Sequence, residues 1–135
     1  MRTRPQGFTM IELIVVIVIL GILAATALPK FIDLNSDAKT AALKGVVGAS
    51  ASAMTINYSG CAVASHVVTA NKCIKVDNCS DLGNIMQGGL PTGYTVAAAA
   101  LGTGLAGSNG IEATCTITQT DGSATGTLTG ISAGN

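Results

Sequence analysis

An uninterrupted apolar run near the start of the chain constrains the fold more than any other feature. The run covers residues 8 to 28, from Phe8 to Leu28, and Glu12 is its only charged side chain. As an α-helix it would be roughly 31 Å long at about 1.5 Å per residue, which is enough to cross the hydrocarbon core of a bilayer. We therefore expect a transmembrane helix at this end of the chain.

The seven residues before the run carry Arg2 and Arg4 and no acidic residue. Positive charge ahead of an apolar segment holds that end in the cytoplasm, so the remainder of the chain should lie outside. A cleaved secretory signal has the same layout, and residues 25 to 27, Ala-Thr-Ala, would be its cleavage site. Glu12 disfavours this alternative, because an acid in an apolar segment costs up to about 3 kcal/mol on insertion. An intramembrane carboxylate is by default a functional hypothesis.

Residues 7 to 12, Gly-Phe-Thr-Met-Ile-Glu, followed by the apolar run and Pro29, resemble the class III signal of type IV prepilins and pseudopilins. In that family a membrane-embedded prepilin peptidase cuts after the glycine and N-methylates the new terminal residue. The resemblance implies a leader of residues 1–7, cleavage between Gly7 and Phe8, and methylation of Phe8. It covers about the first 58 residues, and residues 27–34 further resemble the mannose-sensitive haemagglutinin branch of type IVa pilins.

Cleavage after Gly7 would create an ammonium group on Phe8, one helical turn before the Glu12 carboxylate. A buried acid needs a cation close by. An ion pair within one helix end contributes only a few tenths of a kcal/mol, so the terminus of a neighbouring subunit is the better candidate partner. We expect Phe8 and Glu12 to act together in assembly; the alternative is a protonated Glu12 without a role.

The helical pattern continues beyond the membrane segment of residues 8–29 as an amphipathic segment over residues 30–58. Pro29 removes a backbone donor and clashes with the preceding turn, which predicts a kink near residues 25 to 29; the alternative is that Pro29 ends the membrane helix. In the resembled family the segment corresponding to Gly21–Pro29 can lose helix on assembly.

Small residues from Gly45 to Ala53 predict close approach of a sheet. The expected apolar face consists of Phe31, Leu34, Ala38, Ala42, Val46, Ala49, Ala53 and Ile56.

Residues 59–135 have too few large side chains to bury a sizeable core unaided, so we expect covalent constraint. Cys61, Cys73, Cys79 and Cys115 can supply it, because disulfides persist outside the cytoplasm. Their spacing contains no C-x-x-C pair, which disfavours zinc. Three pairings are possible. We prefer 61 with 73, which closes a short polar loop, and 79 with 115, which ties an early segment to a later strand.

The rest of the chain predicts a short helix over residues 81–87 and three strands over 94–97, 111–118 and 124–131, separated by turn-rich segments. Consecutive short strands favour an antiparallel meander. Packed against the helix, it gives an α+β fold: a long N-terminal helix, its first half transmembrane, against a small antiparallel sheet. This is the outline of a pilin head on residues 59–135.

Catalytic and cofactor chemistry has little support. Seven Lys and Arg balance seven Asp and Glu, so no nucleic-acid partner is expected. His66 is the only histidine, and nothing places it beside a serine and an acid. Residues 102–107 match G-x-G-x-x-G, but no helix pattern or βαβ unit follows. We expect no enzyme activity, no cofactor and no metal site.

The resemblance implies a structural protein: a major type IV pilin that polymerises through its N-terminal helix into a surface filament for adhesion or motility. Its expected partners are further copies of itself, the inner membrane, prepilin peptidase and the pilus assembly platform. It would lie in the bacterial inner membrane before assembly and in the extracellular pilus afterwards. The alternatives are a pseudopilin of a type II secretion system and a secreted, disulfide-bonded binding domain.

Overall fold

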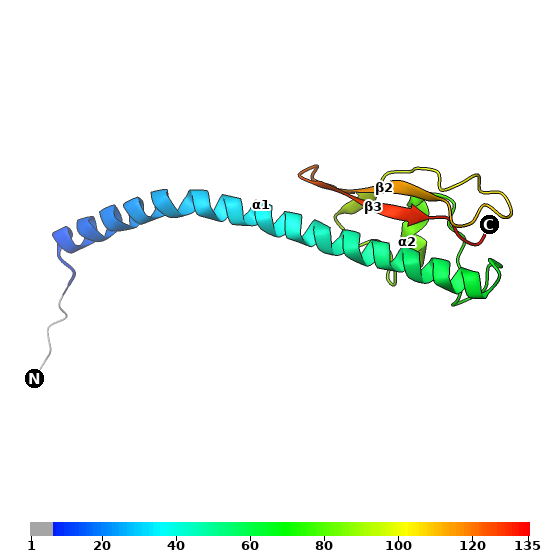
Figure 1. The fold of residues 1–135 in the computed structure, drawn as a ribbon. Coiled ribbons are helices and arrows are strands. Elements are labelled where there is room, and N and C mark those ends of the chain that lie inside the picture. Colours follow the sequence, from blue (N-terminus) through cyan, green and yellow to red (C-terminus); the bar gives the residue numbers. More distant parts are fainter. Residues whose placement is uncertain (1–6) are drawn as a thin grey trace, which may run out of the picture. The chain divides into compact units, whose positions relative to one another are not determined.

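The computed structural model describes residues 7–135, except for the side chains of residues 31–33. It has the expected α+β fold, a long helix followed by a small antiparallel sheet (Figure 1). The chain forms two compact units, which divide between Ala38 and Lys39. The elements in order are α1 (Met10–Val63), the 3-10 turn η1 (Cys79–Asp81), α2 (Leu82–Ile85), β1 (Tyr94–Val96), β2 (Glu112–Gln119) and β3 (Thr125–Ile131).

Helix α1 continues without interruption through Gly21 and Pro29 and ends at Val63, five residues beyond the expected position. The alternative in which Pro29 ends the membrane helix is therefore wrong. Pro29 still cannot donate to the carbonyl of Ala25, and the hydroxyl of Thr26 bonds back to the carbonyl of Leu23 at 3.0 Å. Both features weaken the backbone ladder here, and the kink itself stays a prediction.

The three strands form the predicted meander, in the order β1-β2-β3 with both pairs antiparallel. Their bounds agree with the sequence expectation to within one residue. The predicted short helix is divided between η1 and α2, and Met86 ends it in an extended conformation. Asn78 and Asp81 cap η1 reciprocally through their side chains, which satisfies backbone donors at its start.

The buried face of α1 in residues 39–63 agrees with the predicted stripe only in part: Val46 packs against the core and Ala53 is half-buried. Ala42 and Ala49 are exposed, and Ile56 is 72% exposed. Alanines dominated the predicted stripe, and each offers too little area to decide which face is buried. The face that packs against the sheet and loops includes polar residues and consists of Leu43, Val46, Val47, Ser50, Ala51, Met54 and Asn57.

Glycines of β3 lie where other parts of this unit come close to the sheet, and at Gly126 that part is α1. A side chain at Gly45 or Gly48 would meet nothing within 4 Å, so the expectation that these helix glycines admit the sheet is wrong. On β3, by contrast, a Cβ at Gly126 would lie 2.7 Å from Cγ2 of Val47 on α1. A Cβ at Gly130 would lie 2.6 Å from Sγ of Cys115 and 2.9 Å from Cδ2 of Leu101, in the loop before β2. The two strand glycines therefore leave the space that Val47 and Leu101 fill.

Two disulfides constrain residues 39–135, with the pairing that the sequence argument prefers. Cys61 joins Cys73 across 12 positions, and Cys79 joins Cys115 across 36. The first bond joins the last turns of α1 to the loop after it, where the Asn57 side chain also bonds both the N–H and the C=O of Ile74. The helix end and this loop therefore form one small cluster.

Gly60 is the position where this cluster tolerates no side chain. A Cβ there would overlap the backbone carbonyl oxygen of Lys72, one residue before the disulfide-bonded Cys73. We expect Gly60→Ala to lower the free energy of unfolding by about 2 kcal/mol, because a packed backbone cannot move away freely.

Gly45→Ala is the matched control. It changes an open helical position and should raise the free energy of unfolding by up to about 1 kcal/mol. Denaturant unfolding of the two variants measures both effects, and equal stabilities would contradict the assigned clash.

The β2–β3 hairpin is fastened to the start of this unit. Nζ of Lys39 donates to Oδ2 of Asp121 at 2.7 Å, and Nε2 of Gln119 donates to the Lys39 carbonyl at 2.9 Å. Ser123 donates twice to the other oxygen of Asp121. The hydrogen bond from Lys39, supported by those from Ser123, lowers the pKa of the Asp121 carboxyl.

A depressed carboxyl pKa predicts the direction of the pH dependence. The hairpin contact should be complete above pH of about 4, the ordinary aspartate value, and should weaken as the pH falls towards the lower pKa of the folded state. A carboxyl titration by NMR should place the midpoint of Asp121 below that ordinary value. Lys39→Met should move the midpoint back up, and an unchanged midpoint would contradict the proposed cause.

Candidate functional site

The first turn of α1 is closed by a reciprocal pair of hydrogen bonds between Thr9 and Glu12. The backbone N–H and the hydroxyl of Thr9 donate to Oε2 of Glu12 at 2.8 Å and 2.7 Å. The Glu12 N–H approaches the Thr9 hydroxyl at 3.4 Å. This is a capping box, in which the N-cap and N3 residues satisfy donors that a helix start leaves open.

This cap is not among the features predicted above, although its signal is present in the sequence. A threonine three positions before a glutamate, ahead of an apolar run, is the capping-box pattern. Glu12 therefore has a local partner before any other subunit is considered. Both bonds from Thr9 use Oε2, and no described residue donates to Oε1. One carboxylate oxygen remains available for a second partner.

Gly7 and Phe8 precede the helix in irregular backbone. A side chain at Gly7 would meet nothing within 4 Å, and the Phe8 side chain is 87% exposed. In the unprocessed chain the nitrogen of Phe8 belongs to a peptide bond, so its ion pair with Glu12 stays a prediction. Nothing in the local fold requires glycine at position 7.

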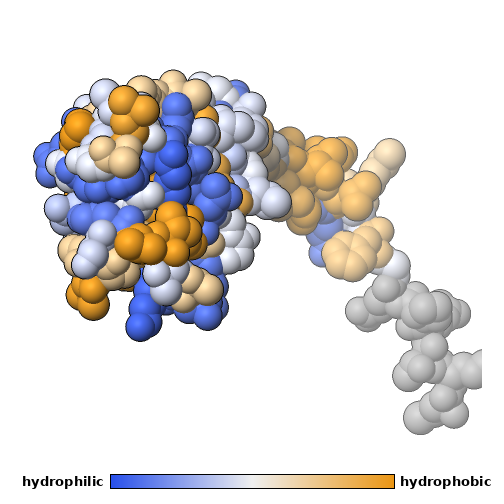
Figure 2. All heavy atoms as spheres, turned by 90° about the vertical axis from the view of Figure 1, so that its right-hand side faces the viewer, coloured by the Kyte–Doolittle hydropathy of each residue, from blue (hydrophilic) through white to orange (hydrophobic). Residues whose placement is uncertain are grey.

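The large side chains of α1 from Met10 to Leu28 are exposed over about half their surface or more. By length and composition this helix could cross a membrane. Figure 2 shows that the surface of this segment is mostly hydrophobic, whereas the surface of residues 39–135 mixes hydrophobic and hydrophilic residues. Burying so much apolar surface is strongly favourable, and the described residues of its own unit supply no cover.

The remaining sequence candidates do not converge on a reactive site. His66 is half-buried with its ring 5.5 Å from that of Tyr58, and its Nδ1 has no hydrogen-bond partner in the described part of the chain. Residues 102–107 form turns with Gly102, Gly104 and Gly107 at positive φ, and β2 rather than a helix follows. Within residues 7–135 no three His, Cys, Asp or Glu side chains gather as metal ligands would.

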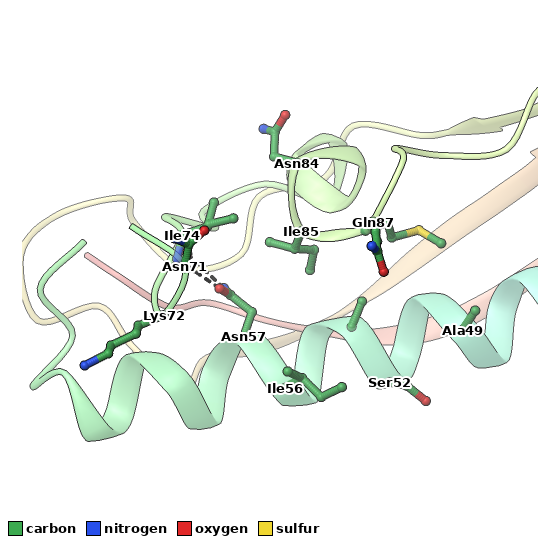
Figure 3. Close-up of a pocket in the computed structure, with 12 residues that line it drawn as sticks. Ala49, Ser52, Ile56, Asn57, Asn71, Lys72, Ile74, Asn84, Ile85 and Gln87 are labelled. Atoms are coloured by element: carbon green, nitrogen blue, oxygen red, sulfur yellow. Dashed lines mark hydrogen bonds between the residues drawn. The ribbon is translucent and has the colours of Figure 1, made fainter. Parts of the chain in front are cut away.

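A groove of about 750 Å³ lies between α1 and the segments that follow it (Figure 3). Ala49, Ser52 and Ile56 form its helix side, and Ile74 and Ile85 lie on the opposite side. Lys72 is the only ionisable side chain among its lining residues. No Asp, Glu, His or Cys lines the groove, and the Ser52 hydroxyl donates back to the Gly48 carbonyl at 3.0 Å.

Comparison with known proteins gives the N-terminal segment a family. Residues 2–28 match the prokaryotic N-terminal methylation motif. The chain is 49% identical over 53 residues to the type IV narrow pilus major component PilA5 of Thermus thermophilus, covering 39% of this chain and 46% of that protein. It is 34% identical over 97 residues to the type IV major pilin protein PilA of Myxococcus xanthus, covering 72% and 39%.

A further relative belongs to secretion rather than to pili. The chain is 45% identical over 53 residues to the type II secretion system core protein G of Pseudomonas aeruginosa, covering 39% of this chain and 37% of that protein. In each case the chain spans less than half the length of the relative. No solved structure matches. The methylation motif and these relatives support a type IV prepilin.

Proposed function

We propose that this chain is a structural subunit of a type IV pilus. The observation that carries the proposal is the exposed apolar part of α1 up to Leu28, which a Thr9–Glu12 capping box opens and which lies inside the matched methylation motif. Such a surface requires lipid or identical helices around it. The chain would be anchored in the inner membrane through α1 and then polymerised by the assembly platform into an extracellular filament.

Within that class we propose a major subunit similar to the mannose-sensitive haemagglutinin branch, on the resemblance of residues 27–34. A pseudopilin of a type II secretion system is the second candidate, because one relative is a core protein of that system. Electron microscopy of sheared surface material separates the two, since a pilin forms long surface filaments. In either role the subunit is structural, without catalysis, and needs no nucleic-acid partner.

We propose that prepilin peptidase cleaves between Gly7 and Phe8 and methylates Phe8. Gly7→Val should leave full-length precursor in the membrane, because the enzyme needs close access to a backbone without a side chain. The open surroundings of Gly7 mean that valine does not disturb the local fold. Intact mass spectrometry of the membrane fraction measures processing, and a normal mature mass would contradict the cleavage site.

We propose that Glu12 sets the axial position of each subunit through the Phe8 ammonium of a neighbour. Apolar helices pack almost equally well when shifted by a turn, whereas a charge pair in low dielectric is directional. Glu12→Gln should insert and be processed normally but should yield at least tenfold fewer filaments. Glutamine also serves in a capping box, so this variant removes the charge and keeps the cap.

Thr9→Val is the matched control, because it removes the hydroxyl of the cap and keeps the charge. We expect its filament yield to stay close to wild type. The measurement pairs mature pilin in the inner membrane, by immunoblot, with filaments recovered by shearing. If Glu12→Gln assembles like wild type, or if Thr9→Val fails equally, the carboxylate acts as a cap and does not determine subunit position.

A further inference from the structure

Strand β3 lies at one edge of the sheet (Figure 1), and along Thr125–Ile131 no described segment pairs with its outer side. Just beyond the strand, Ala133 exchanges two backbone hydrogen bonds with Val76 on that side. The pairing of β3 with β2 shows which backbone N–H and C=O groups of β3 are already hydrogen-bonded. The Gln119 N–H donates to the Ala124 carbonyl, and the Ser132 N–H donates to the Ile111 carbonyl. Antiparallel pairs alternate between bonded and non-bonded positions. The even-numbered residues of β3 therefore bond to β2, and the odd-numbered ones face outward.

Four residues consequently turn their backbone N–H and C=O away from the sheet: Thr125, Thr127, Thr129 and Ile131. No hydrogen bond to these outward groups is present among the described residues. The side chains of the three threonines are exposed as well. A row of unpaired backbone groups is a template for another strand.

Proteins usually block such an edge with a charged side chain, a proline or a bulge. From Gly122 to Asn135 the chain contains no charged residue and no proline. The register from Glu112 opposite Ile131 to Thr118 opposite Thr125 is continuous, without a bulge. At the other edge of the sheet, β1 has only three residues, and short length is itself protective. The outer edge of β3 is therefore less protected against pairing with another strand than the edge formed by β1.

We infer that the outer edge of β3 pairs with β3 of a second copy of this chain, in antiparallel orientation, to form a continuous six-stranded sheet. An uncharged edge meets an identical one without repulsion. A register centred on Leu128 would place Thr127 opposite Thr129 and Thr125 opposite Ile131. The new ladder would end there, because Val76 already pairs with the next outward residue, Ala133. Threonine pairs across strands are themselves mildly favourable.

A role for this contact between filaments rests on the proposed function. Filaments would present the β3 edge in many copies, so weak single contacts between neighbouring filaments would add to strong lateral association. The pairing is therefore a route by which filaments bundle. Contact between two copies in solution does not depend on polymerisation and can be measured separately.

Thr127 is the position for the test because its N–H faces outward. Thr127→Pro removes that donor and leaves the bonds to β2 in place, as edge positions allow. Thr127→Lys adds like charges across the contact, and Thr127→Val is the matched control that keeps the donor. Sedimentation of the mature full-length protein in detergent should show a concentration-dependent dimer for wild type and Thr127→Val. The dissociation constant should rise at least tenfold for the proline and lysine variants.

Sheared filaments supply the second readout. Wild type and Thr127→Val should bundle in electron micrographs, whereas Thr127→Pro and Thr127→Lys should give equal yields of single filaments. A wild-type protein without a dimer, a dimer indifferent to proline or lysine, or an equal loss with valine would each overturn the inference. Failure of every chain to form filaments would count against the proposed function, and the dimer measurement would still decide the edge contact. Peptide mapping of both disulfides in each variant verifies the fold.

Discussion

The first half of α1 has no apolar partner within its own described unit, and the rest of the molecule is organised around that constraint. Large apolar side chains exposed along a helix are unfavourable in water, so a membrane or other helices must cover them. The motif at its start and the single glutamate near its N-terminus are both consistent with a segment that changes surroundings, from lipid to a filament. The capping box makes this helix start well formed before either partner is present.

The second unit is small and has few aromatic residues, yet its interior is closely packed. It reaches that density with small residues at close contacts and with two disulfides, where a larger domain would use bulky side chains. Gly126 and Gly130 lie where the sheet comes nearest to Val47 and Leu101. Ser50 and Asn57 lie on the buried helix face, and Asn57 bonds both backbone groups of Ile74, so a polar residue fixes the helix to the loop.

Local patterns in the sequence predicted the elements well and the contacts poorly. The membrane helix and the three strands follow from composition and alternation, which each segment carries by itself. The buried face of α1 depends on which partner lies beside it, and an alanine stripe says little about that, as the exposed Ile56 shows. The role of the strand glycines was equally hidden, because a missing side chain matters only where another atom fills the space. At the N-terminus, by contrast, the Thr9–Glu12 cap follows a local pattern that the sequence does carry.

The Cys61–Cys73 bond has a mechanical consequence. It joins the last turns of α1 to the loop that continues into the head. A force that pulls α1 along its axis could strip the helix from the sheet, but the segment between the two cysteines could not extend. The Cys79–Cys115 bond withholds a further 36 positions of chain from extension. Under tension such a subunit would lengthen by much less than its residue count allows, so a stretched fibre of these subunits would stiffen early instead of unravelling.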